Sequence, residues 1–145
     1  MDVEREAASG EQSPRKPWWR RWFGTRSERA AQRFVRNMGY RIVRWNYRNE
    51  LGEIDIVAVD GRCVVFIEVR STECADAVRP AESVDHAKQR RLTQLALRFL
   101  KEHRLLNQQA RFDVLAMSWP VGVKEPNIVH HKNAFEAVGK FQMYS

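Results

Sequence analysis

The sequence predicts a mixed α/β domain in which helices pack on the faces of one central β-sheet. Two segments place apolar residues at helical spacing, and five short runs are rich in β-branched and aromatic residues. These segments follow one another in the order α-β-β-β-α-β-β, which favours a mixed sheet covered by helices. A chain of 145 residues has room for one such domain.

Both helices carry an apolar stripe. The first is predicted to begin with Ser27 as its N-cap and to stop at Gly39. Its stripe consists of Ala31, Phe34, Val35 and Met38. The second helix follows a polar loop at 71–83 and is the clearer of the two. Its stripe consists of Val84, Ala87, Lys88, Leu92, Leu95, Ala96, Phe99 and Leu100.

Five segments are predicted as strands, at residues 40–48, 52–59, 62–70, 111–117 and 127–130. The dipeptide Asp60-Gly61 predicts a tight hairpin between the second and the third strand. The third strand is apolar on both faces from Cys63 to Ile67, which is typical of a strand in the centre of a sheet.

The composition excludes several classes of protein. No apolar run approaches the roughly 18 residues that cross a bilayer, which excludes an integral membrane protein. Residues 1–10 are acidic and lack an apolar core, which argues against a secretory signal. Cys63 and Cys74 provide neither a disulfide framework nor a Cys-x-x-Cys zinc pair. A cytoplasmic protein with reduced thiols is the simplest interpretation.

The formal net charge of +7 indicates a polyanionic partner. Residues 1–26 are predicted to form a flexible basic and Trp-rich N-terminal tail, and residues 27–145 a single domain. The Trp/Arg cluster at 15–23 has the composition to stack on bases and hold phosphates, or to lie at a membrane interface. Alternatively, its aromatic residues pack on the domain.

Two carboxylates are expected to meet on the predicted hairpin. If Val59 pairs with Val64, Asp55 lies directly opposite Glu68. The neighbouring register with a two-residue loop also puts Asp55, Glu68 and Arg70 on one face, whereas an odd-length loop would separate them.

Nearby carboxylates repel each other unless a cation lies between them. Oxygen ligands suit Mg²⁺ or Mn²⁺, which also bridge phosphate oxygens and activate water. The alternative is that Asp55 and Glu68 pair with some of the many arginines of the chain.

Each predicted helix adds one ionisable residue to this picture. Glu28 is in step with Ala31 and Val35, so it either complements the helix dipole or reaches into a site below the helix. Lys88 lies on the apolar stripe of the long helix, where it either extends to the edge of the core or reaches the carboxylates.

The sequence also resembles the YraN-like family of small bacterial proteins, over residues 27–135. This family is placed in the PD-(D/E)xK nuclease superfamily, near the archaeal Holliday-junction resolvases. The motifs that carry the resemblance are Gly39-Tyr40, Asn46-Tyr47-Arg48, Gly52-Glu53-Ile54-Asp55, Phe66-Ile67-Glu68-Val69-Arg70, Lys88 and Arg111-Phe112-Asp113.

The resemblance implies a restriction-endonuclease-like αβββαβ core. It also implies that Asp55 and Glu68 bind a metal, with Glu28 as the first-helix glutamate and the Val69 carbonyl as a further ligand. The cofactor implied is Mg²⁺ or Mn²⁺. Asp113 is expected to be structural, and His130 and His131 match no ligand pattern.

Two positions depart from the superfamily motif. Its proline is Ile54 here, a mild change because the following carboxylate is kept. Its lysine is Arg70, and a guanidinium that stays protonated cannot serve as a base. Lys88 is the candidate to supply the missing ammonium from the helix.

The first expectation is therefore a metal-dependent nuclease acting on branched or structured DNA, with Glu28, Asp55, Glu68, Arg70 and Lys88 in its centre. A homodimer is left open. Candidate contacts to the nucleic-acid backbone are Arg33, Arg36, Arg44, Arg48, Arg90 and Arg91. The alternative is a non-catalytic nucleic-acid-binding protein, because Arg70 replaces the catalytic lysine. In a third interpretation the carboxylates are structural and the tail docks on a protein or an anionic membrane.

Overall fold

The structure is a computed structural model that describes residues 24–72 and 84–138. The elements in these residues follow the order α-β-β-β-α-β-β, so the predicted mixed α/β class is confirmed. They are α3 (Gly24–Asn37), β1 (Arg41–Asn49), β2 (Gly52–Asp60), β3 (Cys63–Thr72), α5 (His86–Glu102), β4 (Ala110–Ser118) and β5 (Asn127–Phe135).

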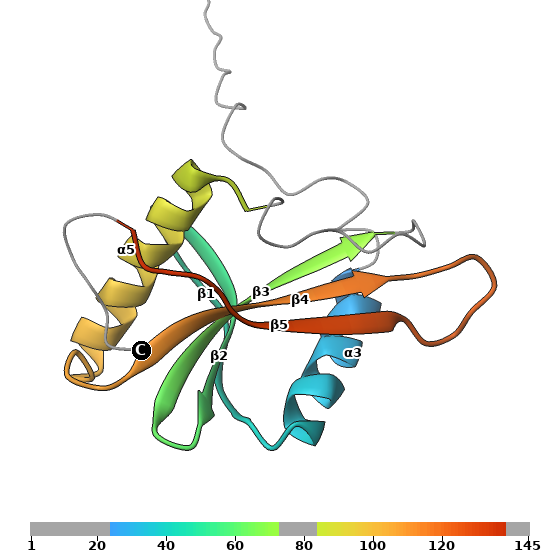
Figure 1. Ribbon diagram of the computed structural model, residues 1–145, viewed down its shortest axis with the longest axis horizontal. Coiled ribbons are helices and arrows are strands. Elements are labelled where there is room, and N and C mark those ends of the chain that lie inside the picture. The colour runs from blue at the N-terminus through green and yellow to red at the C-terminus, as the bar shows by residue number, and fades with distance from the viewer. Residues whose placement is uncertain (1–23, 73–83, 139–145) are drawn as a thin grey trace, which may run out of the picture.

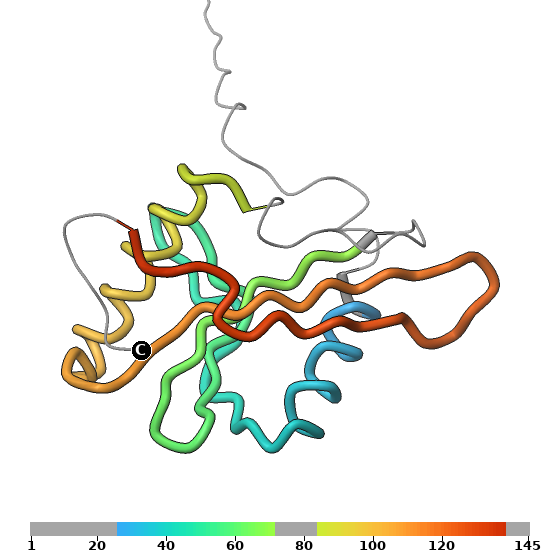
Figure 2. The backbone as a smooth tube through the Cα atoms, viewed as in Figure 1, coloured from blue at the N-terminus to red at the C-terminus, as the bar shows by residue number. Residues whose placement is uncertain are grey.

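The strands form one mixed sheet in the order β1-β2-β3-β4-β5 (Figure 1). Neighbouring strands are antiparallel except β3 and β4, which are parallel and are joined through α5. Figure 2 shows β4 and β5 side by side along their long hairpin. As predicted, the strand that is apolar on both faces, β3, occupies the centre of the sheet.

Each helix covers one face of the sheet, which gives the domain two cores (Figure 1). On β3, Val64 and Phe66 pack under α5. Val65 and Ile67, which alternate with them, pack under α3. Burial on both faces explains why the sequence of β3 is a continuous apolar run. In the part of the chain that the structure describes, no helix has the length and apolar character to cross a bilayer.

The first helix begins earlier than expected, at Gly24, so Ser27 is not its N-cap. The buried Ser27 hydroxyl lies 3.0 Å from the Ser71 hydroxyl and accepts a bond from the Trp119 indole at 3.0 Å. Helix α3 thus includes residues 24–26, and the Arg26 guanidinium lies 3.8 Å from the centre of the Trp119 ring. The Trp/Arg cluster at 15–23 lies outside the described residues.

The β2–β3 hairpin has the register that puts Asp55 opposite Glu68. Val59 pairs with Val64, and Asp60 pairs with Cys63. The turn therefore consists of Gly61 and Arg62 and not of Asp60-Gly61. Gly61 has a φ of 62°, and glycine takes up that left-handed conformation without a steric penalty.

In the strand pair β1–β2, the face on which paired side chains are buried changes halfway along the strands. Trp45 pairs with Ile56, and both pack on the α3 side. Two residues further along, Tyr47 pairs with Ile54, and both pack under α5. Residues two apart on a regular strand share a face, so the alternation is broken at the rung between these pairs.

That rung contains Asn46 on β1 and Asp55 on β2. Asn46 has a φ of 48°, a left-handed conformation that asparagine tolerates better than most residues. The backbone pairing of β2 with β3 ends one residue away, at Ile56 and Ile67. Asn46 therefore lies beside the position at which β2 separates from β3.

We expect Asn46→Val to lower the free energy of unfolding by about 1–2 kcal/mol, because a β-branched residue is strained at this φ. Asn46→Gly serves as the matched control and should change it much less. Urea denaturation of the variants measures the difference. An equal loss in both variants would contradict the conformational explanation and point to the asparagine side chain instead.

The Arg111-Phe112-Asp113 motif builds a buried polar network, as the structural interpretation of Asp113 predicts. Asp113 is fully buried and accepts bonds from Arg111 Nε at 3.0 Å, His130 Nε2 at 2.7 Å and the Asn133 N–H at 2.9 Å. A carboxylate only accepts, so the His130 proton lies on Nε2. Arg111 also binds the Tyr40 hydroxyl at 2.6 Å.

This network joins the end of β1 to β4 and β5. Asp113 pairs with Ile67 across β3 and β4, which puts it on the α3 side of the sheet. The carboxylates of Asp113 and Asp60 contact Arg111 from two sides. Burial acts to lower the pKa of Arg111, but its bonds to Asp113 and neighbouring groups outweigh burial and raise it.

Burial raises the pKa of Tyr40 and Tyr47 above the ordinary value of 10.0. Their neutral forms therefore contribute stability that is complete below pH 10 and is lost as the pH rises through the folded-state values. We expect Tyr40→Phe or Tyr47→Phe to reduce the loss of melting temperature between pH 9 and pH 11, measured by thermal denaturation. Parallel pH profiles for wild type and both variants would contradict this assignment.

Candidate active site

Asp55 lies where β2 and β3 diverge, and it is only 7% exposed. Its Oδ2 accepts a hydrogen bond from the Val69 backbone N–H of β3 at 2.8 Å. Continuing the hairpin register by one residue puts Asp55 opposite Glu68, as the sequence analysis expected. A side chain thus satisfies the N–H of Val69, which would otherwise require a backbone partner.

Glu68 lies on β3 and is 4% exposed. Its Oε2 is 2.7 Å from Lys88 Nζ and 3.5 Å from Arg70 Nε. Lys88 and Arg70 keep 27% and 23% of their side chains exposed, so both cationic side chains are partly open to solvent whereas Glu68 is not. At 2.7 Å, Lys88 and Glu68 form a close ion pair.

The first turn of α5 positions Lys88. Asp85 caps this helix, and its Oδ1 accepts a bond from the Lys88 N–H at 2.8 Å. A cation in the first turn of a helix opposes the helix dipole, and the Glu68 carboxylate compensates for that position. Of the two alternatives for Lys88, the structure therefore has the one in which it reaches the carboxylate.

Glu28 does not share the core-facing stripe of α3, and that prediction is wrong. The buried residues of the first two turns are Ser27, Ala30 and Ala31. Glu28 follows Ser27 by one residue, a rotation of about 100° about the helix axis, and its side chain is exposed. Within residues 24–72 and 84–138, no group of three or more His, Cys, Asp or Glu side chains is placed to hold a metal ion.

The structure thus brings four of the five expected residues together: Asp55, Glu68, Arg70 and Lys88. The sequence did not predict the hydrogen bond from the Val69 N–H to Asp55, because every residue except proline has a backbone N–H and the pattern of residues does not show where it points. It also missed the bonds among Ser27, Ser71 and Trp119, because a serine at a helix start is typical of an N-cap.

The six arginines expected to contact nucleic acid are divided between separate elements. On α3, Arg33 forms an exposed ion pair with Glu125 at 3.3 Å, and Arg36 is exposed. On β1, the Arg48 guanidinium is 3.0 Å from Glu53, and Arg44 lies over the Tyr47 ring at 5.5 Å. Arg90 and Arg91 follow Lys88 on α5.

The comparison with known families matches residues 27–117 to the profile of an uncharacterised protein family, UPF0102. The chain belongs to family UPF0102. The family-level resemblance drawn from the motifs is thereby confirmed. The matched segment runs from Ser27 to Met117, and it contains Asp55, Glu68, Arg70 and Lys88.

Three relatives illustrate how far the similarity to UPF0102 extends. The chain is 39% identical to a UPF0102 protein of Rhodopirellula baltica, over 83% of this chain and 74% of the relative. It is 38% identical to a UPF0102 protein of Persephonella marina, over 78% of this chain and 92% of the relative. It is 46% identical to a UPF0102 protein of Moorella thermoacetica, over 68% of this chain and 82% of the relative.

We expect Lys88 and Glu68 to be energetically coupled by roughly 1–2 kcal/mol, because removing one charge leaves the other in a largely buried position. Urea denaturation of Lys88→Met, Glu68→Gln and the double variant measures this coupling in a double-mutant cycle. Strictly additive effects of the two substitutions would contradict it.

Proposed function

We propose that this UPF0102 protein is a metal-dependent nuclease that hydrolyses phosphodiester bonds in branched or otherwise structured DNA. The observation that carries the proposal is the convergence of Asp55, Glu68, Arg70 and Lys88 where β2 parts from β3. Two carboxylates lie buried beside two cations in this centre. Because water is largely excluded there, electrostatic interactions with a bound phosphate are stronger than they would be at the surface. The sequence motifs support a place in the PD-(D/E)xK superfamily.

The donor set fits a magnesium ion that arrives together with a phosphate. Asp55 and Glu68 provide only oxygen ligands, which Mg²⁺ and Mn²⁺ prefer. Mg²⁺ is commonly bound through one or two carboxylates, with waters and substrate oxygens as its remaining ligands. When bound, the ion supplies charge neutralisation and an activated water. Because Glu28 is exposed, we assign the ligand set to Asp55 and Glu68 without it.

The residues of the chain divide the remaining tasks. The Val69 N–H holds one oxygen of Asp55 and so fixes the orientation of its carboxylate. Lys88 holds Glu68 and presents an ammonium toward solvent, where it stabilises negative charge on an approaching phosphate. Arg70 adds a guanidinium that binds phosphate oxygens and stays protonated throughout, so it takes up no proton.

A second function is supported by one specific observation. Arg70 stands where the superfamily motif has its lysine, and Glu68 is held by two cations of the chain itself. A protein that binds structured nucleic acid without cutting it would keep this arrangement. In that case the cations would attract phosphates, and the carboxylates would orient the cations.

We expect the purified protein to cut four-way junctions or flaps in the presence of Mg²⁺ or Mn²⁺. Asp55→Asn and Glu68→Gln should lower the rate by at least about 100-fold, and Lys88→Met by a comparable factor. Glu136→Gln removes an exposed carboxylate elsewhere and serves as the matched control. Denaturing electrophoresis of end-labelled strands measures cleavage.

Two outcomes would contradict the nuclease assignment. One is salt-sensitive binding of the same substrates without any metal-dependent cleavage, which is the result expected for the binding function. The other is undiminished cleavage by Asp55→Asn, which would place the chemistry elsewhere. Full activity in Lys88→Met with loss in Asp55→Asn would keep the nuclease but remove Lys88 from its mechanism.

A further inference from the structure

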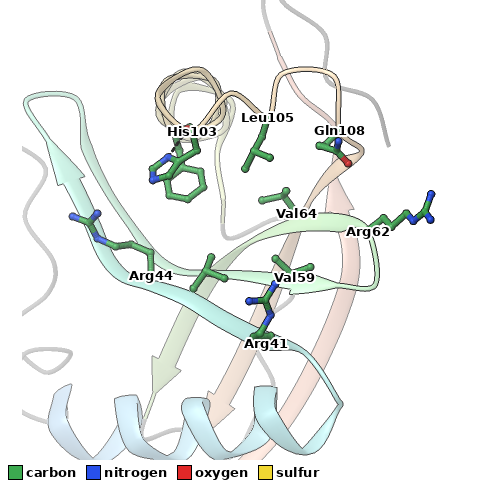
Figure 3. Close-up of a pocket in the computed structure, with 10 residues that line it drawn as sticks. Arg41, Arg44, Val59, Arg62, Val64, His103, Leu105 and Gln108 are labelled. Carbon is green, nitrogen blue, oxygen red and sulfur yellow. Dashed lines mark hydrogen bonds between the residues drawn. The ribbon is translucent and has the colours of Figure 1, made fainter.

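A pocket of about 500 Å³ lies on the α5 side of the sheet, beside the turn of the β2–β3 hairpin (Figure 3). Its walls come from β1, from the ends of β2 and β3, and from the C-terminal part of α5 with the following loop. Arg41, Arg44, Arg62 and His103 contribute polar groups, and none of the ten residues that line the pocket is acidic. Valine side chains, Phe99 and Leu105 form its apolar surface.

A bulge in β1 directs two of these arginines into the same pocket. Arg41 pairs with Val59, Arg44 pairs with Val57, and the register shifts between Ile42 and Arg44. Residues three apart on a regular strand point to opposite faces, whereas these two point to the same one. Bulges commonly re-aim side chains at functional sites. The extra residue in β1 thus places a second arginine of this strand on the face that carries the pocket.

A stacked pair of rings forms the opposite side of the pocket. The rings of His103 and Phe99 stack with their centroids 4.1 Å apart and an angle of 25° between their planes. His103 Nδ1 lies 2.9 Å from the Phe99 carbonyl, which only accepts, so Nδ1 carries a proton and the ring is held in place. Phe99 is buried, whereas His103 is exposed. In Figure 3, His103 lies above Arg41 and Arg44.

We propose that this pocket binds one unpaired nucleotide of a DNA strand, with the base on the His103 ring and the neighbouring phosphates on Arg41 and Arg44. A flat ring beside an arginine pair is the combination that single-strand-binding surfaces use. The volume lies within the range of small-ligand sites, so one nucleotide fits while a duplex does not enter.

This site deepens the proposed function, on which it rests for the identity of its ligand as nucleic acid. Val64 lines the pocket, and Glu68 lies four residues further along β3, on the same face. At about 3.3 Å per residue, the two sites are separated by roughly 13 Å along the strand. The direct line along β3 passes under α5, where Phe66 packs against Phe99, so a bound strand passes around the helix and not along β3. The substrate class is therefore DNA that has unpaired nucleotides near the bond that is cut.

The test is fluorescence anisotropy with a labelled single-stranded oligonucleotide and the duplex of the same sequence, in EDTA so that binding is measured without cleavage. Wild type should bind the single strand more tightly. Arg41→Gln/Arg44→Gln should weaken this binding at least tenfold and lower the salt slope by about 1.4, or 0.7 per lost phosphate contact. His103→Ala should weaken it about tenfold and leave the slope unchanged.

The matched control is Arg29→Gln/Lys132→Gln, which removes the same charge from exposed positions outside the pocket. Equal losses in the control and in Arg41→Gln/Arg44→Gln would overturn the proposal, because net charge alone would then explain the binding. Tighter binding of a polyglutamate peptide than of the oligonucleotide would also overturn it and identify an acidic peptide as the occupant. Because EDTA removes the metal, absence of cleavage in the earlier assay leaves this result unaffected.

Discussion

The structure depends on the hydrogen bond between the Asp55 carboxylate and the Val69 N–H, at the point where β2 separates from β3. A strand that leaves its neighbour exposes backbone donors, and buried donors without partners are costly. Here the Asp55 side chain takes over from the backbone just beyond the last backbone-paired residues, Ile56 and Ile67. The separation of β2 from β3 therefore has two effects at once. It opens the site around Glu68, and it frees the Val69 N–H that orients the Asp55 carboxylate. Asn46, in its left-handed conformation on β1, turns the neighbouring strand at the same rung.

Two groups of charges lie on opposite faces of this sheet, and their surroundings differ. The Asp113 carboxylate under α3 is fully buried and receives bonds from Arg111, His130 and the Asn133 N–H. That arrangement is closed and contributes to the packing of β4 against β5. The Glu68 carboxylate under α5 is held by cations that themselves reach solvent. A buried carboxylate beside partly exposed cations is more open to exchange of partners than the closed Asp113 network.

Much of this arrangement could be predicted from the sequence, because β3 and the stripe of α5 have strong periodicity and the Val59–Val64 register places Asp55 opposite Glu68. The failures have local physical reasons. Glu28 shares its spacing with Ala31 and Val35, but the buried stripe of α3 is centred on Ser27, Ala30 and Ala31, so Glu28 lies at its exposed edge. The pocket could not be predicted either. It depends on the bulge in β1, and one extra residue in a strand leaves no signal in a pattern of alternation.

The helix α5 connects the two sites because it contributes to both. Lys88 in its first turn contacts Glu68, and Phe99 and His103 at its other end form the ring surface of the pocket. Between them the helix is fixed to the sheet by Leu92, Leu95 and Ala96, which are all buried. A packed helix keeps its length, about 1.5 Å per residue, so neither site moves independently along it. The spacing between pocket and carboxylates is therefore a property of the core. Under the proposed function, a DNA strand held at one site would meet the other at a fixed separation, which would favour recognition of a DNA structure over recognition of a base sequence.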